Sequence, residues 1–182
     1  MPSQLSSRKT QEILGLRLRS EIYSLVKRFS GCNFHHLERK SRIPAGTLQY
    51  HLAYLTKHGL LTIQRDGNKM RYFTQDLTIK DRELLTLLRQ RTIRCILLFM
   101  LNNKECRQKD IIAFVKMSPS TVSWYLSRLL KTKIISVAKR DRYARYHLAV
   151  KKEEILSLLI SYKESFFDAL VDHTIDMWTF QL

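Results

Sequence analysis

The 182-residue sequence lacks the local signatures of the common catalytic sites. It has no GxxxxGK[ST] phosphate loop, no HExxH zinc motif and no GxSxG nucleophile turn, and it contains only five glycines. Three of these, Gly31, Gly59 and Gly67, fall where predicted elements end, so they are explained as structural punctuation. We therefore expect a protein that is not an enzyme and that needs no cofactor.

Cysteine is sparse. Cys32, Cys95 and Cys106 form no CxxC pair, which excludes both a disulfide framework and a zinc ribbon and fits reduced thiols in a cytosol. Cys32 is followed by His35 and His36, but this cluster offers too few ligands for a metal site. Cys95 lies in an apolar run, and we expect it to be buried.

Long apolar runs are also missing. The longest uncharged one, Cys95–Leu101, is far too short to cross a bilayer, and the polar N-terminus does not resemble a signal peptide. The sequence has no Gly/Ser-rich linker. These observations predict a cytoplasmic protein without a membrane partner.

What the sequence has in excess is positive charge, with a formal net charge of +16. Residues 151–182 carry three Lys and six Asp or Glu, so residues 1–150 carry 29 basic and 10 acidic side chains, a net of +19. A positive electrostatic field of this size attracts polyanions. Nucleic acid is the first candidate and an anionic membrane the second.

A repeat organises the chain. The stretches Pro44–Leu61 and Ser118–Ile135 are alike, and an offset of 74 residues, 121 minus 47 for their threonines, runs from Ile22/Ile96 to Tyr72/Tyr146 without a gap. Each stretch has apolar residues at i, i+4 and i+7, followed by a β-prone hairpin. Two short helices and a basic hairpin are typical of a winged helix-turn-helix domain.

The predicted fold is therefore mostly α with small β-hairpins (α+β). We divide the chain into a mobile basic arm (1–9), two winged helix domains (10–76 and 91–149), a connector helix (77–90) and a C-terminal amphipathic helical segment (150–182). The arm is either a frayed terminus or a minor-groove contact.

Within the first domain we expect one helix over residues 10–29, a short helix over 34–41, a recognition helix from Pro44 and strands at 60–64 and 70–74 around an Asp-Gly turn. The second domain should have helices at 92–101, 107–116 and 119–132 and strands at 134–138 and 144–148. Lys133 replaces the helix-ending Gly59, and the second turn has no glycine, so we expect that wing to be looser or longer.

The outward faces of the two recognition helices supply the candidate base contacts, because polar side chains there enter the major groove. The candidates are Thr47, Gln49 and Tyr50 in the first repeat and Thr121, Ser123 and Trp124 in the second. Alternatively, the two threonines cap their helices, and Trp124 stacks on the other domain. His51 and Tyr125 are expected to pack.

The wings supply candidate phosphate contacts. Cations on a protruding hairpin give affinity more than sequence choice. They are Arg65, Lys69, Arg71, Lys139, Arg140, Arg142 and Arg145, and the equivalence of Arg71 and Arg145 favours a function over a merely solvated face.

The tail carries apolar residues at helical spacing, which predicts a stripe broader than one small domain can cover. We interpret it as a dimerisation surface, with packing inside one chain as the alternative. Its members are Ile155, Leu159, Tyr162, Phe166 and Leu170.

Three motifs carry a family resemblance: GTLQYHLAYLTKHGLL, STVSWYLSRLLKTKII and the tail SYKESFFDALVDHTIDMW. In these motifs the sequence resembles archaeal predicted transcriptional regulators with two winged helix-turn-helix domains, related to the ArsR and MarR groups. The resemblance covers nearly the whole chain after residue 10. It implies DNA-binding transcription control in an archaeal cytoplasm. The ArsR-type cysteine pair is absent from the first recognition region, so metal sensing is not implied.

We interpret the chain as a transcriptional regulator that binds double-stranded DNA as a homodimer, associated with the nucleoid and in possible contact with the basal transcription machinery. Two alternatives stay open. One is a protein-binding adaptor in a chromosome or transcription-complex scaffold, which would need no cationic face. The other is an architectural DNA-binding protein without sequence preference.

Overall fold

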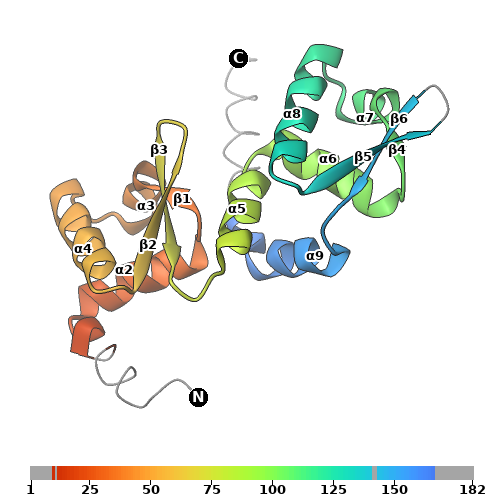
Figure 1. The fold of residues 1–182 in the computed structure, drawn as a ribbon. Coiled ribbons are helices and arrows are strands. Elements are labelled where there is room, and N and C mark those ends of the chain that lie inside the picture. Colours follow the sequence, from red (N-terminus) through yellow and green to blue (C-terminus); the bar gives the residue numbers. More distant parts are fainter. Residues whose placement is uncertain (1–9, 11, 141–142, 167–182) are drawn as a thin grey trace, which may run out of the picture. The chain divides into compact units, whose positions relative to one another are not determined.

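The computed structural model describes residue 10, residues 12–140 and residues 143–166, without the side chains of Lys139 and Arg140. The chain divides into two compact units, Met1–Arg82 and Glu83–Leu182, and each contains helices followed by a β-hairpin (Figure 1). This confirms the predicted mixture of helices and small antiparallel sheets. No helix in the described ranges has both the length and the apolar character needed to span a bilayer.

The two units use the same order of elements, which gives the repeat its physical form (Figure 1). The first unit contains α2 (Arg17–Arg28), β1 (Cys32–Asn33), α3 (Phe34–Ser41), α4 (Ala45–Lys57), β2 (Leu61–Asp66) and β3 (Lys69–Thr74). The helix α5 (Ile79–Leu88) follows. The second unit continues with α6 (Arg91–Asn102), β4 (Cys106–Arg107), α7 (Gln108–Val115), α8 (Pro119–Lys131), β5 (Ile135–Arg140), β6 (Tyr143–Leu148) and α9 (Lys152–Ser161).

Each unit has a three-stranded antiparallel sheet, with order β1-β3-β2 in the first and β4-β6-β5 in the second. The short strands β1 and β4 are absent from the sequence prediction. Cys32 pairs with Tyr72, and Cys106 pairs with Tyr146, so the register also repeats with the offset of 74. These added strands tie each wing to the segment before its helix-turn-helix.

The core of each unit is built from equivalent residues. Eight positions are buried in both repeats, and together they join the first helix, the short strand, the helix-turn-helix and the hairpin. The pairs are Ile22/Ile96, Val26/Met100, Cys32/Cys106, Leu37/Ile111, Leu48/Val122, Leu52/Leu126, Leu55/Leu129 and Leu61/Ile135.

The predicted helix over residues 10–29 is in fact broken. Glu12 to Leu14 are helical, but Leu16 has an extended backbone (φ −79°, ψ 120°), and α2 begins only at Arg17. Gly15 explains the break, because glycine disfavours a helix interior by roughly 1 kcal/mol relative to alanine. Because apolar residues keep their helical spacing across Gly15, the sequence pattern does not indicate the interruption.

The described part of the tail, up to residue 166, contains two helical pieces. α9 ends at Ser161, Tyr162 interrupts it, and residues 163–166 are helical again where the described part ends. The helix α5 lies within the segment expected to be a connector, and just before it the Thr78 hydroxyl accepts a hydrogen bond from the Asp81 N–H (3.1 Å). Four leucines of α5 are buried: Leu84, Leu85, Leu87 and Leu88.

Both recognition helices end in the same left-handed turn. After α4, Leu60 donates its N–H to the Leu55 carbonyl and Gly59 to the Thr56 carbonyl, both at 3.0 Å. After α8, Ile134 and Lys133 form the equivalent bonds, at 3.1 and 3.0 Å. The left-handed residue is Gly59 (φ 71°) in one repeat and Lys133 (φ 55°) in the other. Lys133 thus adopts the left-handed backbone conformation that glycine usually occupies at this position.

The second wing is not longer than the first, so of the two expected differences, looser or longer, the second is wrong. Asp66 pairs with Lys69 and Arg140 pairs with Tyr143, so two residues connect the strands in each hairpin. In the first wing these two are Gly67 and Asn68, one position beyond the predicted Asp-Gly centre. Gly67 has φ 59°, which suits the first central position of a tight hairpin turn.

The left-handed turn predicts that Lys133→Gly stabilises the second unit. Removing the β-carbon relieves about 1 kcal/mol of backbone strain, and the flexibility of glycine in the unfolded chain offsets part of it. We expect a small net gain in the free energy of unfolding, measured by urea denaturation. The reciprocal Gly59→Ala should be destabilising, and because a β-carbon at Gly59 meets nothing within 4 Å, that loss would be conformational. Destabilisation by Lys133→Gly would contradict this account.

Candidate nucleic-acid interface

The exposed face of α4 carries the first group of predicted base contacts. Leu48, Leu52 and Leu55 are at most 1% exposed and fix one side of the helix in the core. Thr47, Gln49 and Tyr50 therefore lie on the opposite side, and all three are exposed. The structure brings these three predicted residues together on one solvent-facing surface.

An aromatic column supports this surface along α4. The rings of Tyr50 and Tyr54 lie 6.5 Å apart, and those of Tyr54 and His58 lie 4.2 Å apart. Arg19 of α2 places its guanidinium 4.0 Å from the Tyr54 ring centroid, which fixes α4 against α2. His51 is buried as predicted. Burial and the positive charge of Arg19 lower the pKa of His51, so its imidazole is neutral at neutral pH.

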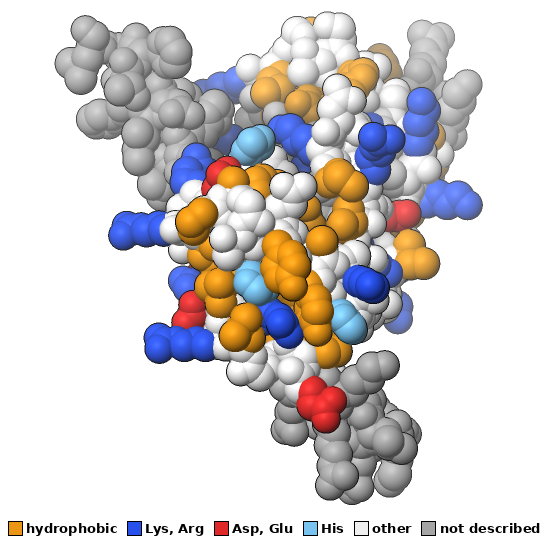
Figure 2. Space-filling view, turned by 90° about the vertical axis from the view of Figure 1, so that its left-hand side faces the viewer, with side chains coloured by type: hydrophobic (Ala, Val, Ile, Leu, Met, Phe, Trp, Pro, Cys, Tyr) orange, Lys and Arg blue, Asp and Glu red, His pale blue; other side chains and the backbone are white. Residues whose placement is uncertain are grey.

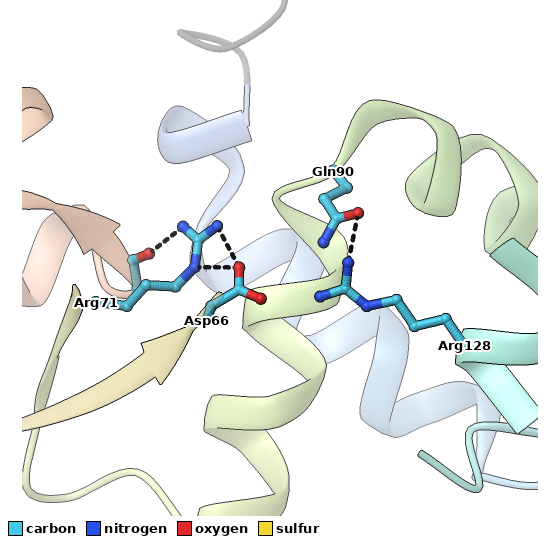
Figure 3. A network of polar contacts seen from close by, with 5 residues as sticks. Asp66, Arg71, Gln90 and Arg128 are labelled. Atoms are coloured by element: carbon cyan, nitrogen blue, oxygen red, sulfur yellow. Dashed lines mark hydrogen bonds and ion pairs between the residues drawn. The ribbon is translucent and has the colours of Figure 1, made fainter. Parts of the chain in front are cut away.

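The second recognition helix, α8, also buries one apolar stripe, but the side chains that it exposes differ from those of α4. Ser123 is exposed and Trp124 is 57% exposed at the position equivalent to Tyr50. The Arg128 guanidinium lies 5.8 Å from the Trp124 ring, and its Nη1 donates to Gln90 Oε1 at 3.1 Å (Figure 3). Tyr125 is half-buried. Each repeat thus exposes one aromatic ring braced by the next turn of its helix.

The two threonines differ in their surroundings. The Thr121 backbone N–H donates to Ser118 Oγ (3.2 Å), and the two hydroxyls lie 2.7 Å apart, so the Thr121 side chain takes part in the helix cap. α4 follows Pro44 and has no side-chain cap, and Thr47 is exposed. The capping alternative therefore describes Thr121, while Thr47 is available to a ligand at the start of α4.

The first wing adds exposed cations to the same unit. Arg65 and Lys69 are exposed near the hairpin turn. Figure 2 shows the face of the first unit on which α4 lies, where Lys and Arg side chains outnumber acidic ones around a centre of apolar and histidine side chains. This face combines exposed polar side chains with a border of positively charged ones.

Arg71 does not project from the wing as expected. It is 9% exposed, and its Nε and Nη2 donate to Asp66 Oδ2 at 2.9 and 2.7 Å (Figure 3). Its Nη1 donates to the Gly31 carbonyl at 3.0 Å. A guanidinium with these partners holds the hairpin against the segment before β1, and it has little surface left for a phosphate.

Arg145 has the equivalent position but a different partner. Its Nη1 lies 3.6 Å from Glu105 Oε2, and both side chains are only partly exposed. Glu105 occupies the position of Gly31 in the repeat, and Arg140 occupies that of Asp66. The carboxylate that faces this arginine therefore comes from the wing in one unit and from the segment before β4 in the other.

The remaining predicted wing contacts fall outside what is described. Arg142 lies outside the described residues, and for Lys139 and Arg140 only the backbone in β5 is described. Of the seven predicted wing cations, Arg65 and Lys69 are thus the ones that the structure places on an exposed surface.

Sequence reasoning missed two pairs of exposed cations. Arg42 and Lys116 occupy the turn of the helix-turn-helix, both with a left-handed backbone (φ 57° and 53°). Lys57 and Lys131 end the two recognition helices. The offset of 74 could have found them, because each pair keeps its charge between the repeats.

The predicted dimerisation stripe divides between core and surface. Ile155 is fully buried and Phe166 is 6% exposed within the chain itself, Leu159 and Tyr162 are half-buried, and Leu170 lies outside the described residues. The Arg94 guanidinium is 5.3 Å from the Phe166 ring centroid. The exposed apolar side chains of α9 are instead Leu156 and Ile160, at 43% and 69%.

The cysteines are free thiols. Cys32 and Cys106 are buried at equivalent positions, and burial raises the pKa of Cys106. Cys95 is partly exposed, contrary to the expectation that it is buried, because it faces the gap between α6 and α7. Among the described residues, no group of three or more His, Cys, Asp or Glu side chains could hold a metal ion.

The helix-turn-helix in each unit, followed by its hairpin, makes this chain a tandem winged helix-turn-helix protein. Residues 17–85 match a family model described as an N-terminal HTH domain, and residues 91–137 match that of the bacterial regulatory proteins of the arsR family. The first match begins at Arg17, the residue at which α2 begins.

A curated relative is the uncharacterized HTH-type transcriptional regulator MJ1398 of Methanocaldococcus jannaschii, which is 25% identical over 146 residues. The match covers 80% of this chain and 37% of the relative, so the chain spans little more than a third of that protein. Together with the two domain matches, this relative confirms the resemblance to archaeal regulators with two helix-turn-helix domains.

Two solved structures are also similar. HlyU from Vibrio cholerae is 20% identical, with a TM-score of 0.41, over 46% of this chain and 89% of that chain. BpsR of Bordetella bronchiseptica is 17% identical, with a TM-score of 0.33, over 74% of this chain and 81% of that chain.

The contacts of Arg71 predict a structural role for this residue. Arg71→Ala removes charge-assisted hydrogen bonds from a mostly buried site, so we expect a loss of about 2–3 kcal/mol in the stability of the first unit. Native-state hydrogen exchange of the β2 and β3 amides would measure it. Arg65→Ala, on the same hairpin but exposed, is the matched control and should leave exchange unchanged. Equal effects of the two substitutions would contradict the anchoring role.

Proposed function

We propose that the protein is a transcriptional regulator that binds duplex DNA through its two winged helix-turn-helix units and has no catalytic activity of its own. The observation that carries the proposal is the exposed face of α4, with Thr47, Gln49 and Tyr50, together with the exposed cations Arg65 and Lys69 of the same unit. The domain matches and the regulator relative support the same function.

The proposed mechanism divides the work between helix and wing. Gln49 can form a bidentate hydrogen bond with the major-groove edge of adenine, and the Thr47 hydroxyl can hold a phosphate near the start of α4. Arg65 and Lys69 contact the sugar-phosphate backbone, where they add affinity without sequence information.

The second unit is proposed to bind the same duplex with less direct base reading. Ser123 and Trp124 offer one small hydroxyl and one large ring, and Trp124 contributes contact area rather than a hydrogen-bond pattern. Lys116 and Lys131 supply phosphate contacts on either side of this surface. Specificity would then come mainly from α4 and affinity from both units.

The setting follows from this function. A regulator of this kind works in the cytoplasm, in association with the nucleoid, because the duplex DNA of an archaeal cell lies there. Contact with the basal transcription machinery is part of the proposal, and it would decide whether binding activates or represses transcription.

Substitutions on α4 and on the wing should act differently on DNA binding. After bound fragments are selected from genomic DNA, Gln49→Ala should cost about 1–3 kcal/mol on the selected site and little on random duplex. Arg65→Ala should weaken binding to both DNAs and reduce the slope of log K against log salt by about 1. Gel shifts at several salt concentrations would measure both.

The exposed Gln75, which lies outside α4, provides the matched control. Gln75→Ala should leave both affinities unchanged. Equal losses on selected and random DNA from Gln49→Ala would indicate an architectural protein without base reading. Absence of any shift with random duplex at low salt would indicate an adaptor that binds protein instead.

The homodimer is proposed to form through the exposed side of α9. Leu156 and Ile160 are one helical turn apart and leave an apolar surface uncovered in the described part of the chain. Binding a second copy there buries both side chains and also doubles the number of DNA-reading units in one assembly.

Ile160→Asp should therefore weaken self-association. Losing one buried Ile side chain raises the dissociation constant by about tenfold or more. Sedimentation equilibrium would measure the change. Ser157→Asp, which adds the same charge at another exposed position of α9, should have a smaller effect. A protein that stays monomeric without any substitution would contradict the dimer proposal.

A further inference from the structure

One surface of the second unit is apolar where the first unit is polar. It is formed by α6 and α7, and we name it the α6–α7 patch: Cys95, Leu98, Phe99, Phe114, Val115 and Met117. Phe114, Leu98 and Met117 are 52%, 42% and 38% exposed. The Phe99 and Phe114 rings stack with centroids 4.7 Å apart. Such a cluster of exposed apolar side chains marks a binding surface in a protein that dissolves in water.

The first repeat provides an internal comparison. Through the offset of 74, the patch residues correspond to Glu21, Ser24, Leu25, Lys40, Ser41 and Ile43, so four of the six positions change from polar to apolar. In the second unit one pocket of about 400 Å³ lies between α6 and α7, whereas the corresponding residues of the first unit line two smaller pockets, of about 310 and 130 Å³. The winged helix fold does not itself require this surface, since the first unit has the fold without the patch.

The charge around the patch selects an acidic occupant. Arg91 lines the pocket together with Cys95 and Phe114, and none of the six lining residues is acidic. Lys116, between Val115 and Met117, is also exposed. An apolar segment that carries carboxylates would therefore match both the surface and its border.

The chain contains such a segment at its C-terminal end. After Lys163 the sequence has no Lys or Arg, and its acids recur every fourth residue at Glu164, Asp168, Asp172 and Asp176. Apolar residues lie between them, including Leu170, Val171 and Trp178. This spacing predicts that a helix over residues 167–182 would have one acidic face and one apolar face.

The position of Phe166 favours an occupant from the same chain. Phe166 is held by Arg94, and Ser165 accepts a hydrogen bond from Arg89, so the described chain ends beside the first turns of α6. Arg91, Thr92 and Cys95, on these same turns, line the pocket. Residues 167–182, about 24 Å long as a helix, continue from this point.

We propose that residues 167–182 bind the α6–α7 patch of their own chain, with apolar side chains on Phe114 and Met117 and carboxylates toward Arg91 and Lys116. The binding is intrachain and separate from the α9 dimer surface, and it shares Lys116 with the proposed phosphate contacts. It gives the cationic protein an acidic segment whose release would uncover an apolar surface.

The test uses Trp178 in the full-length chain with Trp124→Phe, so that it is the only tryptophan. We expect its acrylamide quenching to be well below that of a free peptide of residues 167–182. Leu98→Ser and Phe114→Lys, which install the residues of the first repeat, should each raise quenching toward the peptide value. Losing the Phe114 contact should lower the docking equilibrium constant about tenfold.

Leu16→Ser, which removes an exposed apolar side chain ahead of α2, is the matched control and should not change quenching. Circular dichroism would verify that each variant stays folded, as expected for side chains that are already exposed. Quenching of Trp178 equal to that of the free peptide in the parent chain would overturn the proposal, and so would protection that survives both patch substitutions.

Crosslinking separates the same chain from a second copy. Single cysteines introduced between residues 169 and 181 and oxidised with copper phenanthroline should form a disulfide with Cys95 inside one chain, and Cys95→Ser should abolish it. Mass spectrometry would map the bond. Covalent dimers through Cys95, formed in place of the intrachain bond, would overturn the intrachain form of the proposal.

Discussion

Burial of one apolar stripe on each recognition helix is the constraint on which the rest of the structure depends. Leu48, Leu52 and Leu55 are almost fully buried, as are Val122, Leu126 and Leu129. Burying three such side chains stabilises a small unit by several kcal/mol, roughly 1.5–3 kcal/mol each. The helix cannot rotate without losing this burial, so the side chains on its other face are fixed toward solvent. Recognition chemistry is thus positioned by apolar packing.

The two units keep this constraint and differ elsewhere. The eight paired core positions stay apolar, while the exposed ring changes from Tyr50 to Trp124 and the α6–α7 patch becomes apolar. The repeats thus keep the same core, while parts of the solvent-facing surface differ between them. The contrast between the units separates fold requirements from function within one molecule.

Much of this could be predicted from the sequence, because helical periodicity and the 74-residue offset both report burial. The helix-turn-helix elements, the hairpins and the exposed α4 residues follow from them. The break at Gly15 could not be predicted from periodicity, because apolar spacing continues across it. The strands β1 and β4 have two residues each, too short for any alternation to show.

The largest difference between prediction and structure concerns charge. Sequence position suggested that Arg71 faces DNA, but a cation's role depends on which carboxylate and carbonyl it meets in the fold. Asp66 ends β2 and Gly31 precedes β1, the two strands that pair with β3 on either side. No local sequence pattern indicates that both groups meet Arg71. Arg65 has no such partner nearby in the hairpin register and is exposed.

The exchange of acidic partners between the repeats also affects how each wing can evolve. In the first unit the anchor of Arg71 includes Asp66, next to the hairpin turn, so a change at that residue disturbs the attachment of the whole hairpin. In the second unit Glu105 takes the acidic role away from the hairpin. Mutations near the second turn can then accumulate without detaching its base, which leaves that hairpin freer to change than the first.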